Sequence, residues 1–256
     1  MSIDFDRAAA TLAELWRSGK QATALPPELR PASVEEGYDI QDRFVAALGE
    51  RSVGWKLGVG SRKGKIDSGI GRAIAGRVLG SRCFESGVTV TLPGQAPVTV
   101  EFEIAYVLGR DILPSETADA PWDAVSEVRT TVELVRSRFV DRRAVGWPSF
   151  AADNGGFEAL IVGGIIEKSR QAEVAATAVV LVDGVEKARA LSGDDVTDVE
   201  TAFTDFVALA RSRSMVLPQG SIISTGTATK PFNITGAVAV TVHYLDATLT
   251  FHTKTR

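Results

Sequence analysis

The sequence has little cysteine and little histidine, and both shortages limit the chemistry open to it. Cys83 is the one cysteine in 256 residues, which excludes an internal disulfide and a cysteine-based metal cluster. The two histidines, His243 and His252, both lie near the C-terminal end of the sequence. Zinc sites and hydrolytic sites that depend on histidine are therefore poorly supplied with ligands and bases.

Long apolar runs and clusters of positive charge are also missing. No stretch approaches the roughly 18 apolar residues of a transmembrane helix, and residues 1–7 carry charge without the apolar segment of a signal peptide. The formal net charge is −4, and lysine and arginine are scattered singly, which argues against a nucleic-acid surface. Single basic residues could still form a pocket for a small acid. We therefore expect a soluble cytoplasmic protein that binds neither membrane nor nucleic acid.

The first fifty residues show helical periodicity. Apolar residues between Phe5 and Trp16 recur at the spacing of an amphipathic helix. Prolines at positions 26, 27 and 31 interrupt that pattern, and residues 33–36 have the form of a capping box for a second helix that runs through Leu48. Two N-terminal helices are therefore expected.

After residue 53 the sequence is punctuated by glycine and favours strands. Residues 98–108 give the clearest strand, and residues 123–130 are predicted to form a helix that leads into a strand at 131–136. Further strands are expected at 159–166, 176–182 and 221–225, a helix after a capping box at 197–200, and a hairpin at 237–244 and 248–253. No repeat or low-complexity linker is present. The pattern favours one α+β domain over residues 1–256, with an N-terminal α/β part (1–80) and a β-rich core (81–256).

Two glutamates project from one face of the predicted strand at residues 98–108. Side chains alternate between the faces of a strand, so Glu101 and Glu103 share a face with Ala105 and Val107, while the other face is apolar or aromatic throughout. A Glu-x-Glu pair most often faces water. Here the apolar residues that continue the same face indicate that this face is partly buried.

Glu133 lies in a second segment of strand character, residues 131–135, where a buried carboxylate needs a partner. Three converging carboxylates repel one another, and a divalent cation balances their charge. Oxygen ligands select Mg²⁺, Mn²⁺ or Ca²⁺ over zinc. Three protein ligands leave positions for water and substrate, which is typical of an enzyme. We therefore predict a metal site in the core at Glu101, Glu103 and Glu133.

Five segments of the chain resemble, in the same order, the hydratase/decarboxylase branch of the fumarylacetoacetate hydrolase superfamily. That branch includes 2-oxopent-4-enoate hydratase and 4-oxalocrotonate decarboxylase. Five segments in order are specific at the level of the superfamily. The segments are GWKLG at 54–58, VEFEIA at 100–105, VELVRSR at 132–138, ADN at 152–154 and GSIISTG at 220–226.

The resemblance implies a β-rich mixed roll with an N-terminal helical part, and a Mg²⁺ or Mn²⁺ ion held by the three glutamates. It implies a metal-dependent lyase for 2-oxo or 2-hydroxydienoic acids in aromatic meta-cleavage catabolism, similar to 4-oxalocrotonate decarboxylase or 2-hydroxypenta-2,4-dienoate hydratase. It also implies a homo-oligomer, alone or in complex with a sister hydratase or decarboxylase. Lys56 is the implied active-site lysine, either for proton transfer or as a fixed cation for the substrate's negative charge.

The matching segments also supply candidate substrate contacts. The candidate residues in the strand at 221–225, and the glycine just after it, offer hydroxyl and N–H groups for the substrate carboxylate. Such residues also form ordinary turns. The two candidates just before Gly155, Asp153 and Asn154, lie in a sequence typical of a loop. Arg138 could instead pair with an acid such as Asp141. The candidates are Ser137, Arg138, Asp153, Asn154, Ser224, Thr225 and Gly226.

One position departs from the hydratases. Hydratases of this family carry an aspartate for proton handling in a Pro-Asp-x-Gly segment, whereas the equivalent residues here, 73–76, place Ile74 at that position. Decarboxylases have Pro-Ile-x-Gly there. An apolar side chain keeps the surroundings of a departing carboxylate dry, so Ile74 slightly favours decarboxylation over hydration and is included among the residues at the substrate.

Two other interpretations stay open. An acylpyruvase-type C–C hydrolase shares the fold and the metal, but such enzymes use a histidine to activate water, and no histidine precedes His243. Their third metal ligand is usually aspartate, where this chain has Glu133. An inactive scaffold that retains the fold is the second alternative, which the missing aspartate suggests and the presence of Lys56 and all three glutamates opposes.

Overall fold

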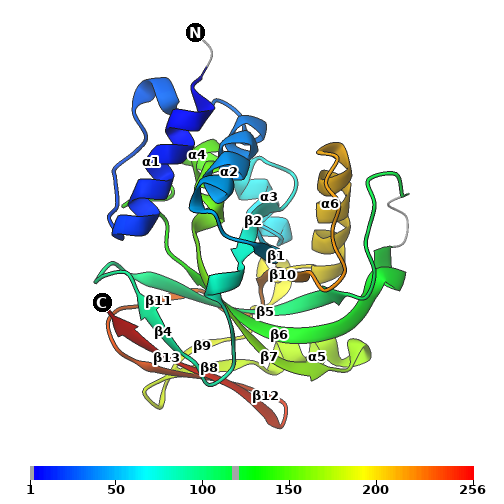
Figure 1. Ribbon diagram of the computed structural model, residues 1–256. Coiled ribbons are helices and arrows are strands. Elements are labelled where there is room, and N and C mark those ends of the chain that lie inside the picture. Colours follow the sequence, from blue (N-terminus) through cyan, green and yellow to red (C-terminus); the bar gives the residue numbers. More distant parts are fainter. Residues whose placement is uncertain (1–2, 117–120) are drawn as a thin grey trace.

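The computed structural model describes residues 3–116 and 121–256. Its strands form two sheets that pack face to face (Figure 1). In spatial order, the eight-stranded sheet contains β2 (Ile74–Leu79), β1 (Ser52–Gly58), β10 (Ile222–Thr227), β5 (Val98–Leu108), β6 (Val125–Val135), β7 (Phe157–Ile166) and β3 (Cys83–Glu85), and β11 (Phe232–Ile234) pairs with β5. The five-stranded sheet contains β4 (Thr89–Leu92), β13 (Ala247–Thr255), β12 (Ala239–Tyr244), β8 (Val179–Val182) and β9 (Val185–Arg189).

Most helices cover the face of the larger sheet that points away from the smaller one. Figure 1 shows α1, α2, α3, α4 and α6 on that side, while α5 lies at one end of the sheets. The helices of the described residues are α1 (Phe5–Ser18), α2 (Val34–Leu48), α3 (Arg62–Ser68), α4 (Gly146–Ala152), α5 (Gln171–Thr177) and α6 (Val199–Ser212). The structure thus confirms the α+β class with an N-terminal helical part.

The main hydrophobic core lies between the two sheets. The apolar face of β5 contributes Phe102, whose ring stacks on that of Tyr244 in β12 with centroids 5.5 Å apart. Both side chains are buried, and burying a large apolar side chain stabilises the fold by roughly 1.5–3 kcal/mol. The alternation of β5 therefore directs its glutamates toward the helices on the opposite face.

Helix boundaries follow the capping signals, with one shift. The Ser33 hydroxyl accepts a hydrogen bond from the N–H of Glu36 at 3.2 Å, as the capping box predicts for α2. For α6 the cap is Asp198, whose carboxylate accepts the N–H of Thr201 at 3.0 Å. The prediction placed the start of that box at Thr197, but the Thr197 hydroxyl instead donates to a backbone carbonyl of β10.

Two predicted elements were wrong in type over part of their length. Residues 123–130 form the end of a short 3₁₀ turn (Pro121–Ala124) and the first half of β6, not a helix. β6 pairs with β5 from Val125 opposite Leu108 to Val135 opposite Thr99, so long-range pairing overrides local helix propensity. Residues 176 and 177, expected in a strand, end helix α5, and the strand begins at Val179.

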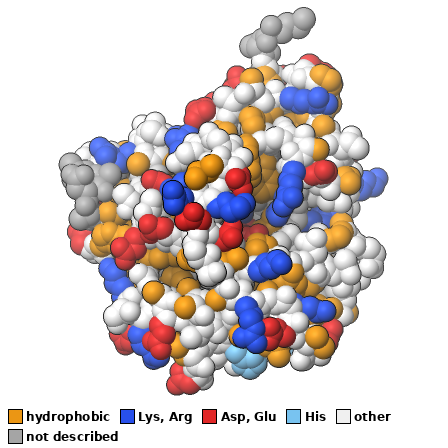
Figure 2. All heavy atoms as spheres, turned by 180° about the vertical axis from the view of Figure 1, so that it is seen from behind, with side chains coloured by type: hydrophobic (Ala, Val, Ile, Leu, Met, Phe, Trp, Pro, Cys, Tyr) orange, Lys and Arg blue, Asp and Glu red, His pale blue; other side chains and the backbone are white. Residues whose placement is uncertain are grey.

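The N-terminal part and the β-rich core share one sheet. β1 and β2 lie within residues 1–80, yet β1 pairs in parallel with β10 from the C-terminal part. The single domain over 1–256 stays a prediction, and a division at residue 80 does not separate two sheets. None of the helices in the described ranges is both long and apolar enough to cross a bilayer. Figure 2 shows acidic and basic side chains interspersed over one face of the molecule.

Candidate active site

Strand pairing brings the three predicted metal ligands together. Glu101 of β5 lies directly opposite Glu133 of β6, and Glu103 follows two residues along on the same face. Each glutamate offers a carboxylate oxygen, and these oxygens all lie within 4.8 Å of one another. Glu103 and Glu133 are fully buried, whereas Glu101 is partly exposed. The geometry therefore matches a site for one cation that is open on the side of Glu101.

Glu103 is held by donors from β10 on one of its oxygens. Its Oε2 accepts a hydrogen bond from the Ser224 hydroxyl at 2.5 Å and from the N–H of Gly226 at 3.1 Å. Ser224 is itself hydrogen-bonded to Thr131 of β6. Oε1 is buried and has no hydrogen-bond partner among the described residues. An orphaned buried oxygen is costly, and a bound cation supplies the missing partner.

Lys56 reaches the same cluster from β1. It lies opposite Ser224 of β10 in the parallel pair, so its side chain is on the face that carries the glutamates. Its ammonium lies 2.9 Å from Glu133 Oε1, outside hydrogen-bond geometry, and donates to Oε2 at 3.1 Å. Lys56 is only 3% exposed. A buried lysine of this kind requires such a partner.

The electrostatics of the glutamates favour a cation. Burial raises the pKa of Glu103 well above its ordinary value, and the charges of Glu133 and Glu101 raise it further. Burial also raises the pKa of Glu133 to about 7, although the nearby Lys56 acts in the opposite direction. Carboxylates that repel one another in a buried site bind a divalent cation readily. Oxygen-only donors and the orphaned Glu103 oxygen therefore fit Mg²⁺, Mn²⁺ or Ca²⁺.

A cavity of about 650 Å³ opens onto this cluster. Lys56 and Glu101 line it from the sheet, and residues of α3 and of the segment that precedes α4 line it from the helical side. Arg142, Trp147 and Phe150 contribute a cation and two aromatic rings. A concave site of this volume, lined by aromatic rings and by convergent charged groups, is typical of an enzyme pocket.

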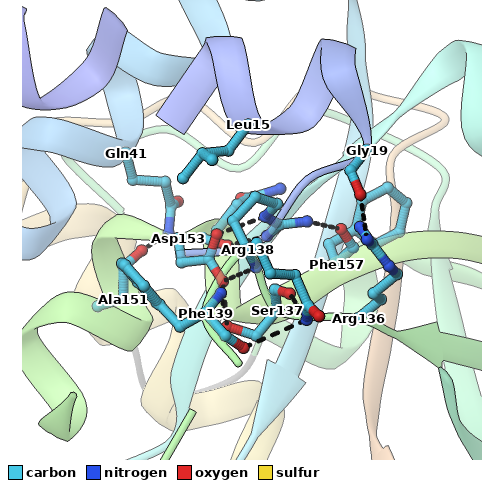
Figure 3. Close-up of polar contacts among 12 residues, drawn as sticks. Leu15, Gly19, Gln41, Arg136, Ser137, Arg138, Phe139, Ala151, Asp153 and Phe157 are labelled. Atoms are coloured by element: carbon cyan, nitrogen blue, oxygen red, sulfur yellow. Dashed lines mark hydrogen bonds and ion pairs between the residues drawn. The ribbon is translucent and has the colours of Figure 1, made fainter. Parts of the chain in front are cut away.

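Ser137, Arg138 and Asp153 form a buried network that does not line this cavity. Figure 3 shows the Arg138 guanidinium directed at Asp153, with which it forms an ion pair, and at the carbonyl of Phe157. The Ser137 hydroxyl donates to the same Asp153 carboxylate at 2.7 Å. Arg138 therefore pairs with Asp153 and not with Asp141, whose carboxylate caps backbone N–H groups.

Asn154 fixes the turn that follows Asp153. Its amide oxygen accepts the N–H of Arg77 at 2.6 Å and its amide nitrogen donates to the Arg77 carbonyl at 2.9 Å, so the side chain continues the edge of β2. The next residue, Gly155, packs on Lys56 so closely that a Cβ there would lie 2.9 Å from Lys56 Cε. These residues thus support the site through Lys56, and direct contact of Asp153 or Asn154 with substrate stays a prediction.

The remaining predicted residues are divided between site and core. Gly226 lines the cavity, while the Thr225 hydroxyl is buried and donates to the carbonyl of Ile104. Ile74 lies opposite Gly58, which places it on the site face of the sheet, but its side chain is 1% exposed and belongs to the main core. Its role at the substrate is therefore also untested.

Sequence reasoning missed the contribution of the segment before α4 and of α4 itself. The Phe150 ring lies near both Lys56 and Arg142. Its centroid is 5.9 Å from Lys56 Nζ and 5.9 Å from Arg142 Cζ. The one available signal was a pair of adjacent arginines, 142 and 143, which lie eight and seven residues before Phe150. A pair of arginines is common on protein surfaces, so this signal is weak.

Comparisons with known proteins place the chain in a family. The sequence model of the Fumarylacetoacetate (FAA) hydrolase C-terminal family matches residues 80–245. A 4-oxalocrotonate decarboxylase from Pseudomonas sp is 30% identical over 164 residues, 63% of this chain and 63% of that protein. A 2-keto-4-pentenoate hydratase from Paraburkholderia xenovorans (strain LB400) is 28% identical over 162 residues, 62% of this chain and 60% of that protein. The chain thus spans less than two thirds of the length of either curated relative.

A solved structure extends the agreement over the whole fold. The 4-oxalocrotonate decarboxylase from Pseudomonas putida G7, complexed with magnesium and adipate, superposes with a TM-score of 0.83 over 98% of this chain and 97% of that one. The sequence identity is 19%, so this likeness concerns the fold. It includes the N-terminal helices, which lie before the segment that the family model matches.

Proposed function

Because the chain belongs to the fumarylacetoacetate hydrolase C-terminal family, we propose that it is a metal-dependent lyase for 2-oxo or 2-hydroxydienoic acids of aromatic meta-cleavage catabolism. Its reaction is that of 4-oxalocrotonate decarboxylase or of 2-hydroxypenta-2,4-dienoate hydratase. The observation that carries the proposal is the cluster of Glu101, Glu103 and Glu133, with Lys56 beside it, at the end of a cavity. The two curated relatives carry the names of these two activities.

The three glutamates would hold Mg²⁺ or Mn²⁺. When bound, such a cation would supply chelation of the carboxylate and 2-oxygen of a 2-oxo acid and stabilisation of the negative charge that develops on that oxygen. Ser224 and Gly226 keep the Glu103 carboxylate in place. The 4-oxalocrotonate decarboxylase from Pseudomonas putida G7 is described in complex with magnesium in one structure and with calcium in another, which supports a hard divalent cation.

Lys56 is the group in the site that can hold or move a proton. In decarboxylation, the bond to the departing carboxylate breaks, its electron pair passes along the conjugated carbons to the 2-oxygen, and one proton is taken up. In hydration, water adds its hydroxyl and one proton across the distal double bond, and the remaining enol becomes the 2-oxo acid when the 2-oxygen loses its proton and the adjacent carbon gains one. Lys56 Nζ lies beside Glu133 and lines the cavity, where it can serve either reaction as acid or as a fixed cation.

Decarboxylation is the favoured branch of this proposal. The position equivalent to the hydratase aspartate is Ile74, which is buried and apolar, so the activated water that hydration needs has no acidic partner there. A C–C hydrolase has less support, because no histidine lines the cavity within the described residues, and His243 and His252 lie on β12 and β13 of the other sheet.

The proposal is tested by product analysis. Purified protein with Mg²⁺ is offered 2-oxohex-3-enedioate and, separately, 2-hydroxypenta-2,4-dienoate, and the products are identified by NMR. We expect turnover of at least one compound, with CO₂ released if the protein is a decarboxylase and a 4-hydroxy-2-oxo acid formed if it is a hydratase. Turnover of neither compound with Mg²⁺ or Mn²⁺ would overturn the proposal and favour the inactive scaffold.

The glutamates provide the matched controls for that assay. Glu101→Gln, Glu103→Gln and Glu133→Gln each remove one charged ligand at nearly constant shape, so each should weaken Mg²⁺ binding and nearly abolish activity while circular dichroism stays native. Full activity in all three variants would show that the metal is held elsewhere.

Assembly and location are part of the proposal as well. The resemblance implies a homo-oligomer, alone or with a sister hydratase or decarboxylase, and the sequence itself predicts a cytoplasmic location. Light scattering of the purified protein measures the subunit number directly.

A further inference from the structure

We infer that Arg142 binds a second carboxylate at the far end of the substrate, so that the cavity selects 2-oxo dicarboxylic acids over 2-oxo monocarboxylic acids. The inference rests on the proposed function, in which the substrate's first carboxylate is bound by the metal that the three glutamates would hold. It goes beyond that function because it assigns the choice of substrate class to one residue.

The cations that line the cavity differ in whether they already have a partner. Lys56 pairs with Glu133, and the ammonium of Lys63 lies 2.5 Å from the carboxylate of Asp67. The guanidinium groups of Arg142 and Arg143 also line the cavity, and neither forms an ion pair or a hydrogen bond within the described residues. A charged group that lines a ligand cavity without a partner is the one best able to bind an anionic ligand.

Arg142 is distinguished from Arg143 by its surroundings. Arg142 is partly buried and lies 5.9 Å from the centroid of the Phe150 ring, while Arg143 is exposed. Lys56 Nζ is 5.9 Å from the centroid of the same ring, so Arg142 and Lys56 are no farther apart than twice that distance. A charge beside apolar groups is screened less by water than an exposed charge. Arg142 should therefore interact more strongly with a bound carboxylate than Arg143 does.

The chemistry of the guanidinium identifies the ligand. Arginine presents a planar fork of donors that matches the two oxygens of a carboxylate. A conjugated 2-oxo acid would be bound through its first carboxylate and 2-oxygen by the metal that the glutamates hold, and would extend into the cavity by a few carbon atoms. A second carboxylate on its last carbon would reach toward Arg142. The acidic residues Asp67 and Asp195 line the side of the cavity formed by α3 and the turn Gly193–Asp195. Asp67 is paired with Lys63, so the charge of Asp195 is the one that disfavours a second carboxylate on that side, whereas Arg142 favours it.

The kinetic consequence is specific. Arg142 would bind the carboxylate in the ground state, and a carboxylate that departs as CO₂ loses its charge, so the arginine gives no extra stabilisation to the transition state. Loss of Arg142 should therefore raise KM for a dicarboxylic substrate without lowering kcat by a comparable factor.

Binding of saturated analogues tests the inference independently of turnover. Protein loaded with Mg²⁺ is titrated calorimetrically with 2-oxohexanedioate and with 2-oxopentanoate, neither of which has the conjugated chain that the reaction requires. We expect wild type to bind the dicarboxylate at least ten-fold more tightly. Arg142→Gln should weaken dicarboxylate binding by roughly ten- to hundred-fold, as for a lost hydrogen bond between charged groups, and change monocarboxylate binding by less than about three-fold.

Arg143→Gln is the matched control, because it removes an equal charge from the rim of the same cavity and should leave the preference unchanged. Arg142→Lys keeps the charge and loses the fork, and should retain an intermediate preference. Equal affinity of wild type for both analogues, or an unchanged preference in Arg142→Gln with a native thermal midpoint, would overturn the inference. If the preference disappears in Arg143→Gln instead, the inference is also wrong. If wild type prefers the dicarboxylate and Arg142→Gln removes that preference, but no conjugated substrate is converted, the proposed function fails while the assignment of Arg142 stands.

Discussion

Lys56 is held in place by groups from three separate parts of the chain. Its ammonium contacts the carboxylate of Glu133 in β6. Its Cε packs against Gly155, where an added Cβ would lie 2.9 Å away. The centroid of the Phe150 ring in α4 lies 5.9 Å from its nitrogen. These contacts fix one position for a side chain that would otherwise have many rotamers, and loss of that freedom on binding substrate is thereby avoided.

Replacement of Lys56 separates its chemical role from its packing. Lys56→Met keeps most of the side-chain length and removes the charge, so Mg²⁺ should still bind while kcat falls by about two to four decades, the usual effect of losing an acid–base group. Steady-state kinetics with a saturating metal concentration measures this. An increase in KM alone would show that Lys56 only positions the substrate.

Single residues show how far the sequence predicts the site. The period-two alternation of β5 was enough to place Glu101 and Glu103 on one face, because a strand leaves no other arrangement. Arg142 could not be found in this way, since its position depends on how the segment before α4 folds over the sheet. Arg138 illustrates a third case, because the sequence marked it as part of the site and the structure pairs it with Asp153 in the interior.

Among the elements, the C-terminal hairpin was predicted closely, whereas β6, which carries Glu133, was recognised as a strand only in its second half. Residues 125–130 were expected to be helical, yet they extend β6 along the whole of β5. Their local propensities are weak, and pairing with a neighbour decides the outcome. Helices α3 and α4 were not expected, since each has only seven residues and a short helix leaves little periodicity in a sequence.

The turn Asn154–Gly156 supplies a prediction at this scale. Gly155→Ala places a Cβ 2.9 Å from Lys56 Cε at a backbone φ of +59°, so the lysine must move and the activity should fall at least ten-fold, given the sensitivity of catalysis to small displacements. Mg²⁺ binding, which uses the glutamates, should be retained. Activity and calorimetry on the same preparation measure the two effects.

Gly184→Ala is the control for backbone strain. Gly184 has a φ of +78°, and a Cβ added there would have no atom within 4 Å, so the substitution costs roughly 1–2 kcal/mol of stability for the left-handed backbone but touches nothing. Its activity should stay near that of wild type. Equal activity of the two alanine variants would mean that Gly155 does not position Lys56.

For the whole molecule, the buried glutamates link stability to pH. Glu103 and Glu133 have raised pKa values in the folded protein, and that of Glu133 is about 7 against an ordinary value of 4.5. Between these values the folded state binds more protons than the unfolded state, so the free energy of unfolding falls as pH rises. Without metal, the thermal midpoint should therefore decrease from about pH 5 to about pH 8.

Two comparisons isolate this effect from other titrations. Mg²⁺ should raise the midpoint most at the alkaline end, where the carboxylates are ionised and ready to bind it. Glu103→Gln removes one member of the repelling cluster, so without metal this variant should be more stable than wild type at about pH 8 and should respond less to Mg²⁺. A wild-type midpoint that rises over this range in the absence of metal contradicts the prediction.

The position of β10 has a consequence for synthesis of the protein. β10 lies between β1, which carries Lys56, and β5, which carries two of the glutamates, although it follows both by more than a hundred residues in the sequence. A chain emerging from the ribosome can pair β5 with β6 early, but β1 has no parallel neighbour until residues 222–227 are made. Such long-range parallel pairing forms slowly. Lys56 and the glutamates are therefore brought together only in a nearly finished chain, so a nascent chain that stalls before β10 contains all four residues without the strand that joins β1 to β5.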